Sequence, residues 1–218
     1  MRILTVCGCD IAAYTIVIPA NPDPAEKTAA EFLKRVISAS CGVTLSVSDQ
    51  MTERSIVIGS RETHPTIKWD GFRTATDDRH LYLHGNIPRG TLYAAYDFAE
   101  KHLGYRYFAD DCEVIPTEGE ADVPASLNII DNPVFESRRH SWIGNYEHSD
   151  YGSFNRNTDV SDEKYGKGIR NAGCHTFNIY CPDHVYYDQH PEYFSLSITP
   201  TARKTGTASD SAAPMTPS

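Results

Sequence analysis

The chain has 218 residues, of which 40% are hydrophobic, 11% aromatic and 22% charged. This composition supplies enough apolar surface for a packed core and excludes a chain that is disordered throughout. The net charge is −9 and no basic run exceeds two residues, which argues against a nucleic-acid-binding face. No apolar run approaches the roughly 20 residues of a transmembrane helix, so we expect no membrane partner.

The first ten residues, MRILTVCGCD, contain only a short apolar run before the cysteines. A secretory signal needs an apolar core of roughly 7–15 residues. We therefore expect Ile3–Val6 to form a first strand, Gly8 to form a turn, and the chain as written to be cytoplasmic. The six cysteines include no C-x-x-C pair, so we expect reduced thiols and neither a metal site nor a cofactor.

The next segment predicts a strand followed by a capped helix. Residues 14–19 are a β-branched run, typical of a strand. Asp23 is a good helix cap, Pro24 fits the first helical position, and Glu26 stands where an acid reaches back to the cap. Apolar residues then recur at helical spacing until Gly42, where we expect the helix to end.

Further strands and a second helix complete the first part of the chain. The elements expected there are strands at 44–48, 55–58, 70–76, 81–85, 105–108 and 113–116, and a helix from Pro88 to Gly104. Residues 77–80, which begin with two aspartates, form the turn of a hairpin. This order is not a strict β-α-β alternation, so it predicts an α+β fold with a mixed sheet and two helices on one face.

The chain changes character after residue 128. Residues 132–140 are typical of a linker entering a strand, and 144–170 form a polar stretch without periodicity, which indicates a long functional loop. Residues 175–180 predict another strand. From residue 198 onward the sequence is rich in Thr, Ser, Ala and Pro and lacks aromatic residues, Leu and Val, so we expect that tail to be disordered.

An ordered set of motifs carries a family resemblance. The motifs are 14–19 (YTIVIP), 25–31 (AEKTAAE), 56–59 (IVIG), 70–72 (DGF), 88–93 (PRGTLY), 103–108 (LGYRYF), 133–136 (PVFE), 174–177 (CHTF) and 190–194 (HPEYF). Together they resemble domain of unknown function family 4838, a family of bacterial glycoside-hydrolase-like proteins, over about residues 10–197. The first part is similar to the accessory domain shared by α-glucuronidases and β-N-acetylhexosaminidases.

The resemblance implies three regions. Residues 1–127 would be an accessory α+β domain like the second domain of hexosaminidases, and 128–197 the first strands of an incomplete (β/α)8 barrel. Residues 198–218 would be a tail. The resemblance continues past Phe194 only in a shifted reading frame, so a frameshifted end is one explanation of the tail and a true end is the other.

The resemblance also implies what the chain does. Related glycosidases carry their acid and base carboxylates further along the barrel, so we expect no catalytic residue here. The first hypothesis is an inactive, truncated fragment of a glycan-degrading enzyme. The alternative is a non-catalytic carbohydrate-binding or scaffolding module. A third hypothesis, a metal- or thiol-dependent enzyme, would use Cys174, Cys181 and nearby histidines. The expected partner is a glycan, and the sequence predicts no oligomeric state.

Four residues are candidates for contact with that glycan. Related hexosaminidases place an arginine on the first barrel strand to bind sugar hydroxyls, which implies this role for Arg138. Trp142 and Tyr146 are expected to stack on a pyranose ring, with packing between domains as the alternative. His175 would bind a substrate hydroxyl, unless it is a buried structural histidine.

Two arginines have structural alternatives. For Arg138 the alternative is an ion pair with Glu136 or Asp131. Arg89 is best explained structurally, as a bridge between the accessory domain and the barrel, with Gly90 allowing a tight turn.

Overall fold

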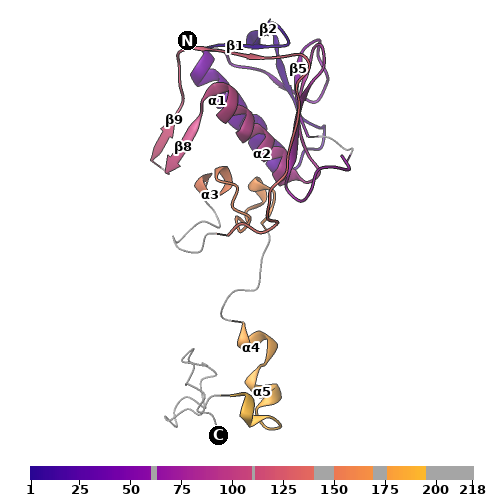
Figure 1. Ribbon diagram of the computed structural model, residues 1–218, viewed down its shortest axis with the longest axis vertical. Helices are drawn as coiled ribbons and strands as arrows, with labels where there is room; N and C mark the ends of the chain where they lie inside the picture. The colour runs from indigo at the N-terminus through magenta and orange to yellow at the C-terminus, as the bar shows by residue number, and fades with distance from the viewer. Residues whose placement is uncertain (60–62, 110, 140–149, 169–175, 195–218) are drawn as a thin grey trace. The chain divides into compact units, whose positions relative to one another are not determined.

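The computed structural model of the protein describes residues 1–59, 63–109, 111–139, 150–168 and 176–194 (Figure 1). It divides into one compact unit over Met1–Arg170 and another over Asn171–Ser218. None of the helices in the described part of the chain has the length and apolarity needed to span a bilayer.

The first unit is a mixture of strands and helices, as expected. In chain order it contains β1 (Ile3–Val6), β2 (Cys9–Asp10), η1 (Ile11–Ala13), β3 (Thr15–Val17), α1 (Pro24–Cys41), β4 (Val47–Ser48), β5 (Ser55–Ile58), β6 (Phe72–Thr76), β7 (Leu81–Gly85), α2 (Pro88–Phe98), η2 (Ala99–Leu103), β8 (Arg106–Ala109), β9 (Cys112–Val114), β10 (Glu120–Val123), β11 (Asn128–Asp131), α3 (Asp150–Phe154) and η4 (Glu163–Tyr165). This confirms the predicted α+β class.

The main sheet has six strands in the order β11-β6-β7-β5-β3-β4. Strands β4, β3, β5 and β7 run parallel to one another, whereas β6 pairs antiparallel with both β7 and β11. The hairpin β6–β7 turns at residues 77–80, where we expected it. Two smaller sheets, β10-β1-β2 and β8-β9, complete the unit. The main sheet is therefore mixed, as the departure from β-α-β alternation predicted.

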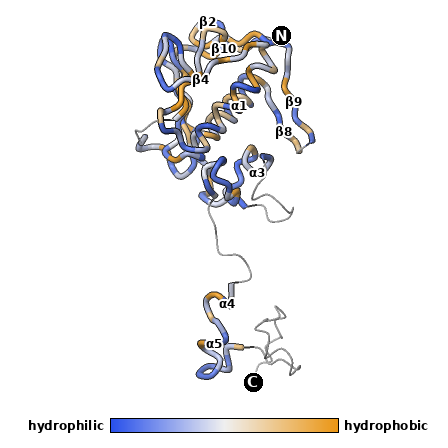
Figure 2. Tube along the Cα trace, turned by 180° about the vertical axis from the view of Figure 1, so that it is seen from behind, coloured by the Kyte–Doolittle hydropathy of each residue, from blue (hydrophilic) through white to orange (hydrophobic). Residues whose placement is uncertain are grey.

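Helix α1 begins and ends where its sequence signals predicted. The Asp23 carboxylate accepts a hydrogen bond from the backbone N–H of Ala25 at 3.0 Å, and the Glu26 carboxylate accepts one from the Asp23 N–H at 2.8 Å. Gly42 ends the helix with a left-handed φ of 75°. Hydrophilic and hydrophobic stretches alternate along α1 (Figure 2), as a helix with one buried face requires.

Helix α2 also begins at the predicted proline and stops at Gly104, which has φ 69°. Its last turn is wider than expected, because Ala99–Leu103 form a π-helical turn. The N–H of Tyr105 then bonds the Ala99 carbonyl at 3.1 Å. No pattern in the sequence predicts that the helix widens into a π-helical turn. This turn leads the chain from α2 into β8.

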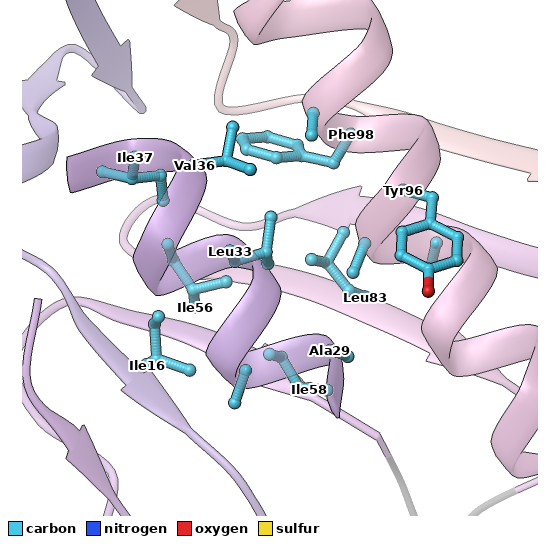
Figure 3. Packing of buried hydrophobic residues seen from close by; sticks show 14 of the residues in the cluster. Ile16, Ala29, Leu33, Val36, Ile37, Ile56, Ile58, Leu83, Tyr96 and Phe98 are labelled. Carbon is cyan, nitrogen blue, oxygen red and sulfur yellow. The ribbon is translucent and has the colours of Figure 1, made fainter. Parts of the chain in front are cut away.

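Both helices cover the same face of the main sheet (Figure 1). The core between them is drawn in Figure 3, and its buried members include Ile16, Leu33, Val36, Ile37, Ile56, Ile58, Leu83 and Phe98. Burying one such aliphatic or aromatic side chain stabilises the fold by roughly 1.5–3 kcal/mol. Apolar burial is therefore what holds the sheet and its helices together.

Glycines bring the start of α2 against the hairpin. A Cβ on Gly85 would lie 2.4 Å from the carbonyl carbon of Gly90, and a Cβ on Gly90 would lie 2.5 Å from the Gly71 carbonyl oxygen. No side chain fits at these positions, so backbone packs directly on backbone. This close approach places Arg89, in the first turn of α2, next to Asp70.

Beyond residue 127 the structure differs in part from the linker and strand that the sequence predicted. Strand β11 comes directly after that expected domain end and pairs with β6 from Asn128 opposite Ala75 to Asp131 opposite Phe72. Residues 132–139 contain no strand. The boundary at 127 and the barrel beyond it stay predictions.

The described residues of the second unit form α4 (Phe177–Tyr180), α5 (Asp183–Tyr186) and η5 (Pro191–Tyr193). The strand predicted at 175–180 is therefore wrong for its described part. The N–H groups of Ile179 and Tyr180 both bond the Thr176 carbonyl, at 2.9 and 3.1 Å, which closes a helical turn. A β-branched run forms a strand only when a neighbouring strand accepts its hydrogen bonds, and residues 176–194 contain none.

Candidate functional site

A buried carboxylate is the centre of the site. The side chain of Asp70 is fully shielded from solvent and lies just before β6. Its Oδ2 atom accepts hydrogen bonds from Arg89 Nε at 3.0 Å and from Arg138 Nη2 at 2.6 Å. Its Oδ1 atom is buried and has no hydrogen-bond partner within the described residues. One oxygen of this carboxylate thus accepts hydrogen bonds from two cations, and the other is buried without a partner.

Arg89 joins Asp70 to the segment around residue 167. Its side chain is 4% exposed, and its Nη1 group donates to the carbonyl of Lys167. The neighbouring Gly166 has a left-handed φ of 83°, and a Cβ there would lie 2.5 Å from the backbone nitrogen of Arg89. Only glycine combines that backbone angle with so close an approach. Arg89 therefore contacts residues well beyond 128, as a bridging role requires.

Arg138 is held from several sides. Its backbone N–H donates to Thr158 Oγ1 at 2.9 Å, and its carbonyl accepts the Thr158 N–H at 2.8 Å. Its guanidinium donates to the carbonyls of Arg156 at 3.0 Å and Phe135 at 2.8 Å, as well as to Asp70. A guanidinium has five N–H groups. Three of them are bonded here, and the other two have no partner in the part of the chain that is described.

A cleft of about 580 Å³ lies beside Asp70 and Arg138. Most of its lining residues are charged. The charged residues that line it are Asp70, Asp97, Glu100, Asp131, Lys101, Arg106, Arg138 and Arg156. Acids and bases are equal in number, so the cleft offers hydrogen-bond donors and acceptors without a dominant charge. Such a lining suits a polar ligand with several hydrogen-bonding groups.

Arg156 organises the far wall of the cleft. Its Nη2 group lies 3.3 Å from Asp97 Oδ1 and 3.4 Å from Glu100 Oε2. Lys101 Nζ also contacts Asp97, at 2.8 Å. Arg156 has a left-handed φ of 59°, which is uncommon for a residue with a side chain. The carboxylates of Asp97 and Glu100 are therefore both paired with one cation, Arg156, from outside the helix.

The structure gives a partner for Arg138 that the sequence did not. Neither Glu136 nor Asp131 is its ion-pair partner; Asp70, 68 residues earlier, takes that place. Asp70 belongs to the DGF motif, but the sequence assigned it no role. Two sequence features could have indicated this site. Asp70 stands directly before Gly71 at the start of a strand, and Arg89 stands directly before Gly90 at the start of a helix.

The other three predicted glycan contacts, Trp142, Tyr146 and His175, lie outside the described residues, so their roles stay predictions. The described cysteines Cys7, Cys9, Cys41, Cys112 and Cys181 are free thiols. Within the described ranges no group of three or more potential ligands is arranged to hold a metal ion. Cys174, named in the metal- or thiol-dependent hypothesis, also lies outside those ranges.

Comparison with known proteins identifies the family of the second half. Residues 107–213 match the family described as a domain of unknown function, DUF4838, which confirms the family that the ordered motifs indicated. No curated protein sequence matches the chain.

Three solved structures of glycoside hydrolases are similar to parts of the chain. A GH115 4-O-methyl-α-glucuronidase with specificity for decorated arabinogalactans shares 15% identity over 58% of this chain and 18% of its own, with a TM-score of 0.44. A GH20 exo-β-N-acetylglucosaminidase from Vibrio harveyi shares 16% identity over 57% of this chain and 16% of its own, with a TM-score of 0.36. A GH138 enzyme targeting pectin rhamnogalacturonan II shares 17% identity over 40% of this chain and 13% of its own, with a TM-score of 0.33. The chain thus spans less than a fifth of each of these proteins.

Proposed function

Taking residues 107–213 as a DUF4838 segment, we propose that the chain is part of a carbohydrate-active protein and that its polar cleft binds glycan hydroxyl groups. The observation that carries this proposal is the Arg138 guanidinium, which lines the cleft, is partly exposed and has two N–H groups without a partner among the described residues. A ligand oxygen that accepts from one of these N–H groups gains a charge-assisted hydrogen bond.

Adjacent sugar hydroxyls fit this guanidinium. A hydroxyl both donates and accepts, whereas a guanidinium only donates. The oxygens of two neighbouring hydroxyls would accept from the two unbonded N–H groups of Arg138. Because Asp70 and the carbonyls of Phe135 and Arg156 already hold the guanidinium, it does not need to reorganise on binding.

The arrangement favours binding over hydrolysis by these residues. Glycoside hydrolysis usually needs two carboxyl groups, one of which keeps its proton in an apolar setting. Asp97 and Glu100 line the cleft, but both contact Arg156, and Asp97 also contacts Lys101. Neither side chain lies in an apolar setting. The proposal for this chain is therefore a glycan-binding part of a larger carbohydrate-active assembly, whose catalytic carboxylates lie elsewhere.

The finer architecture belongs to the same proposal. Residues 1–127 would serve as the accessory domain and 128–197 as the beginning of a (β/α)8 barrel, with 198–218 as a tail. Trp142 and Tyr146 would supply stacking rings, and His175 a further hydrogen bond. The ordered motifs support this division, since the accessory-domain motifs come before residue 108 and the remaining ones follow residue 132.

The test compares two neighbouring arginines. Arg138→Gln removes the cleft donor, whereas Arg139→Gln removes an exposed arginine whose ion-pair partner is Asp159, 3.6 Å away. Glycan-array screening of the full chain, followed by calorimetric titration of the best ligand, should give about a tenfold loss of affinity for Arg138→Gln, in line with one charge-assisted hydrogen bond. Arg139→Gln should bind normally. Equal binding by both variants, with equal thermal stability, would contradict the proposal.

A further inference from the structure

We infer that a second pocket, lined by aromatic rings and separate from the polar cleft, binds the ring of one uncharged sugar. The pocket has a volume of about 320 Å³ and lies between α1, β8 and the segment from α3 to η4. This inference takes its ligand class, a glycan, from the proposed function. The aromatic pocket shares no lining residue with the cleft beside Asp70.

Five aromatic side chains form the walls of this pocket: Phe32, Tyr96, Tyr105, Tyr107 and Phe154. Their rings brace one another edge to face. The ring centroids of Phe32 and Tyr96 are 4.8 Å apart, those of Phe32 and Tyr105 5.1 Å, and those of Tyr105 and Phe154 5.0 Å. Interlocked rings keep their positions when a ligand enters, so little ordering cost accompanies binding.

Two of the wall tyrosine hydroxyls are already bonded within the protein. The Tyr96 hydroxyl lies 3.2 Å from Ser153 Oγ, and the Tyr105 hydroxyl donates to Glu113 Oε1 at 2.5 Å. Burial raises the pKa of Tyr96, so this phenol stays neutral. Tyr96, Tyr105 and Phe154 are buried, so the partly exposed rings of Phe32 and Tyr107 offer the surface that the apolar face of a pyranose stacks against.

The rim of the pocket adds charge of both signs. Its charged residues are Glu31, Arg35, Asp150 and Lys164, and all four are exposed at the edge of the aromatic walls. Two acids and two bases cancel, so the rim favours neither an anion nor a cation. Together they offer both acceptors and donors to the hydroxyl groups around a sugar ring.

This combination separates a sugar from the other ligands that aromatic pockets bind. An organic cation is favoured by ring faces with surplus negative charge nearby. Here Arg35 already lies over Phe32, with its guanidinium 5.8 Å from the ring centroid. A purely apolar ligand would leave the four rim charges without new partners. An uncharged ring with one apolar face and several hydroxyls uses both the walls and the rim.

The test uses two neighbouring aromatic residues on β8. Tyr107 lines the pocket and is half-buried, whereas Phe108 is 61% exposed and does not line it. Saturation-transfer NMR on the full chain, with methyl glycosides of glucose, galactose, xylose and N-acetylglucosamine as probes, should show transfer to the sugar ring protons. Tyr107→Ala should weaken the strongest of these interactions about tenfold, and Phe108→Ala should change it less than twofold.

A third variant separates this inference from the proposed function. If Tyr107→Ala weakens methyl-glycoside binding and Arg138→Gln does not, the aromatic pocket binds sugar and the cleft proposal fails. If Arg138→Gln weakens binding and Tyr107→Ala behaves like Phe108→Ala, the pocket inference is overturned and the cleft proposal stands. Loss in both variants supports both sites. The inference is overturned if no glycoside shows saturation transfer. It is also overturned if phenol displaces the bound glycoside but no other sugar does.

Discussion

The two parts of the first unit differ in the forces that hold them. Residues 1–131 build a sheet and two helices around an apolar core, whereas residues 132–168 join that core through Phe154, Val160 and Tyr165 and are also tied to it by hydrogen bonds and ion pairs of Arg89, Arg138 and Arg156. Apolar burial is non-directional. Buried ion pairs depend on every partner being present. The candidate site lies where the second kind of attachment meets the first.

The largest effect should come from removing the carboxylate that both arginines share. Asp70→Ala leaves Arg89 and Arg138 without their buried counter-charge, so we expect a loss of about 3–5 kcal/mol in the free energy of unfolding. Asp78→Ala, an exposed residue of the nearby hairpin turn, should change it by less than about 0.5 kcal/mol. Urea titration measures both. Equal effects would show that the arginines do not attach the second part.

A cavity in the apolar core should lower the free energy of unfolding nearly as much as Asp70→Ala, but it should act on residues 1–131. Leu33 is fully buried between α1 and the sheet. Leu33→Ala should lower the free energy of unfolding by about 2–5 kcal/mol, and Val47→Ala, at a site 41% exposed, by much less. Hydrogen exchange then sharpens the comparison. Leu33→Ala should weaken amide protection in β5 and β7, and Asp70→Ala that in residues 150–168. The reverse pattern would break the comparison.

The cap of α1 should contribute less. Asp23→Ala removes the hydrogen bond to the Ala25 N–H and one half of the capping box. A loss of about 1 kcal/mol in the free energy of unfolding is expected. Asp23→Asn keeps a side-chain acceptor and serves as the matched control. If both substitutions cost the same, the cap does not stabilise the helix as the geometry indicates.

The smallest expected effect is a dependence of fold stability on pH, which arises at the hairpin β8–β9. Two hydrogen bonds from Arg35 hold the pKa of Glu113 below its ordinary 4.5. Because the folded pKa is lowered, this bond stabilises the fold fully above the ordinary value and is lost as pH falls through the folded value. Thermal unfolding between pH 7 and acid should show a shallower decline for Glu113→Gln than for the unmodified chain. Parallel curves would contradict this.

Sequence reasoning succeeded where a residue's neighbours in the chain decide its structure. Asp23, Glu26 and Gly42 cap α1 through contacts within three or four residues, and the acidic turn at 77–80 closes a local hairpin. The Asp70–Arg138 pair depends instead on how distant segments meet, which no local pattern encodes. The strand predicted at 175–180 failed for a related reason, because strand pairing also needs a distant partner. The π turn after α2 had no sequence signal.

The hydrogen bond from the Arg138 guanidinium to a glycan hydroxyl is tested most directly by the nitrogen-15 NMR signal of that guanidinium, assigned in the full chain and followed while the best array ligand is added. We predict that this signal shifts with the same saturation curve as the ligand's own resonances. Saturable binding that leaves the Arg138 signal unchanged would contradict the proposal.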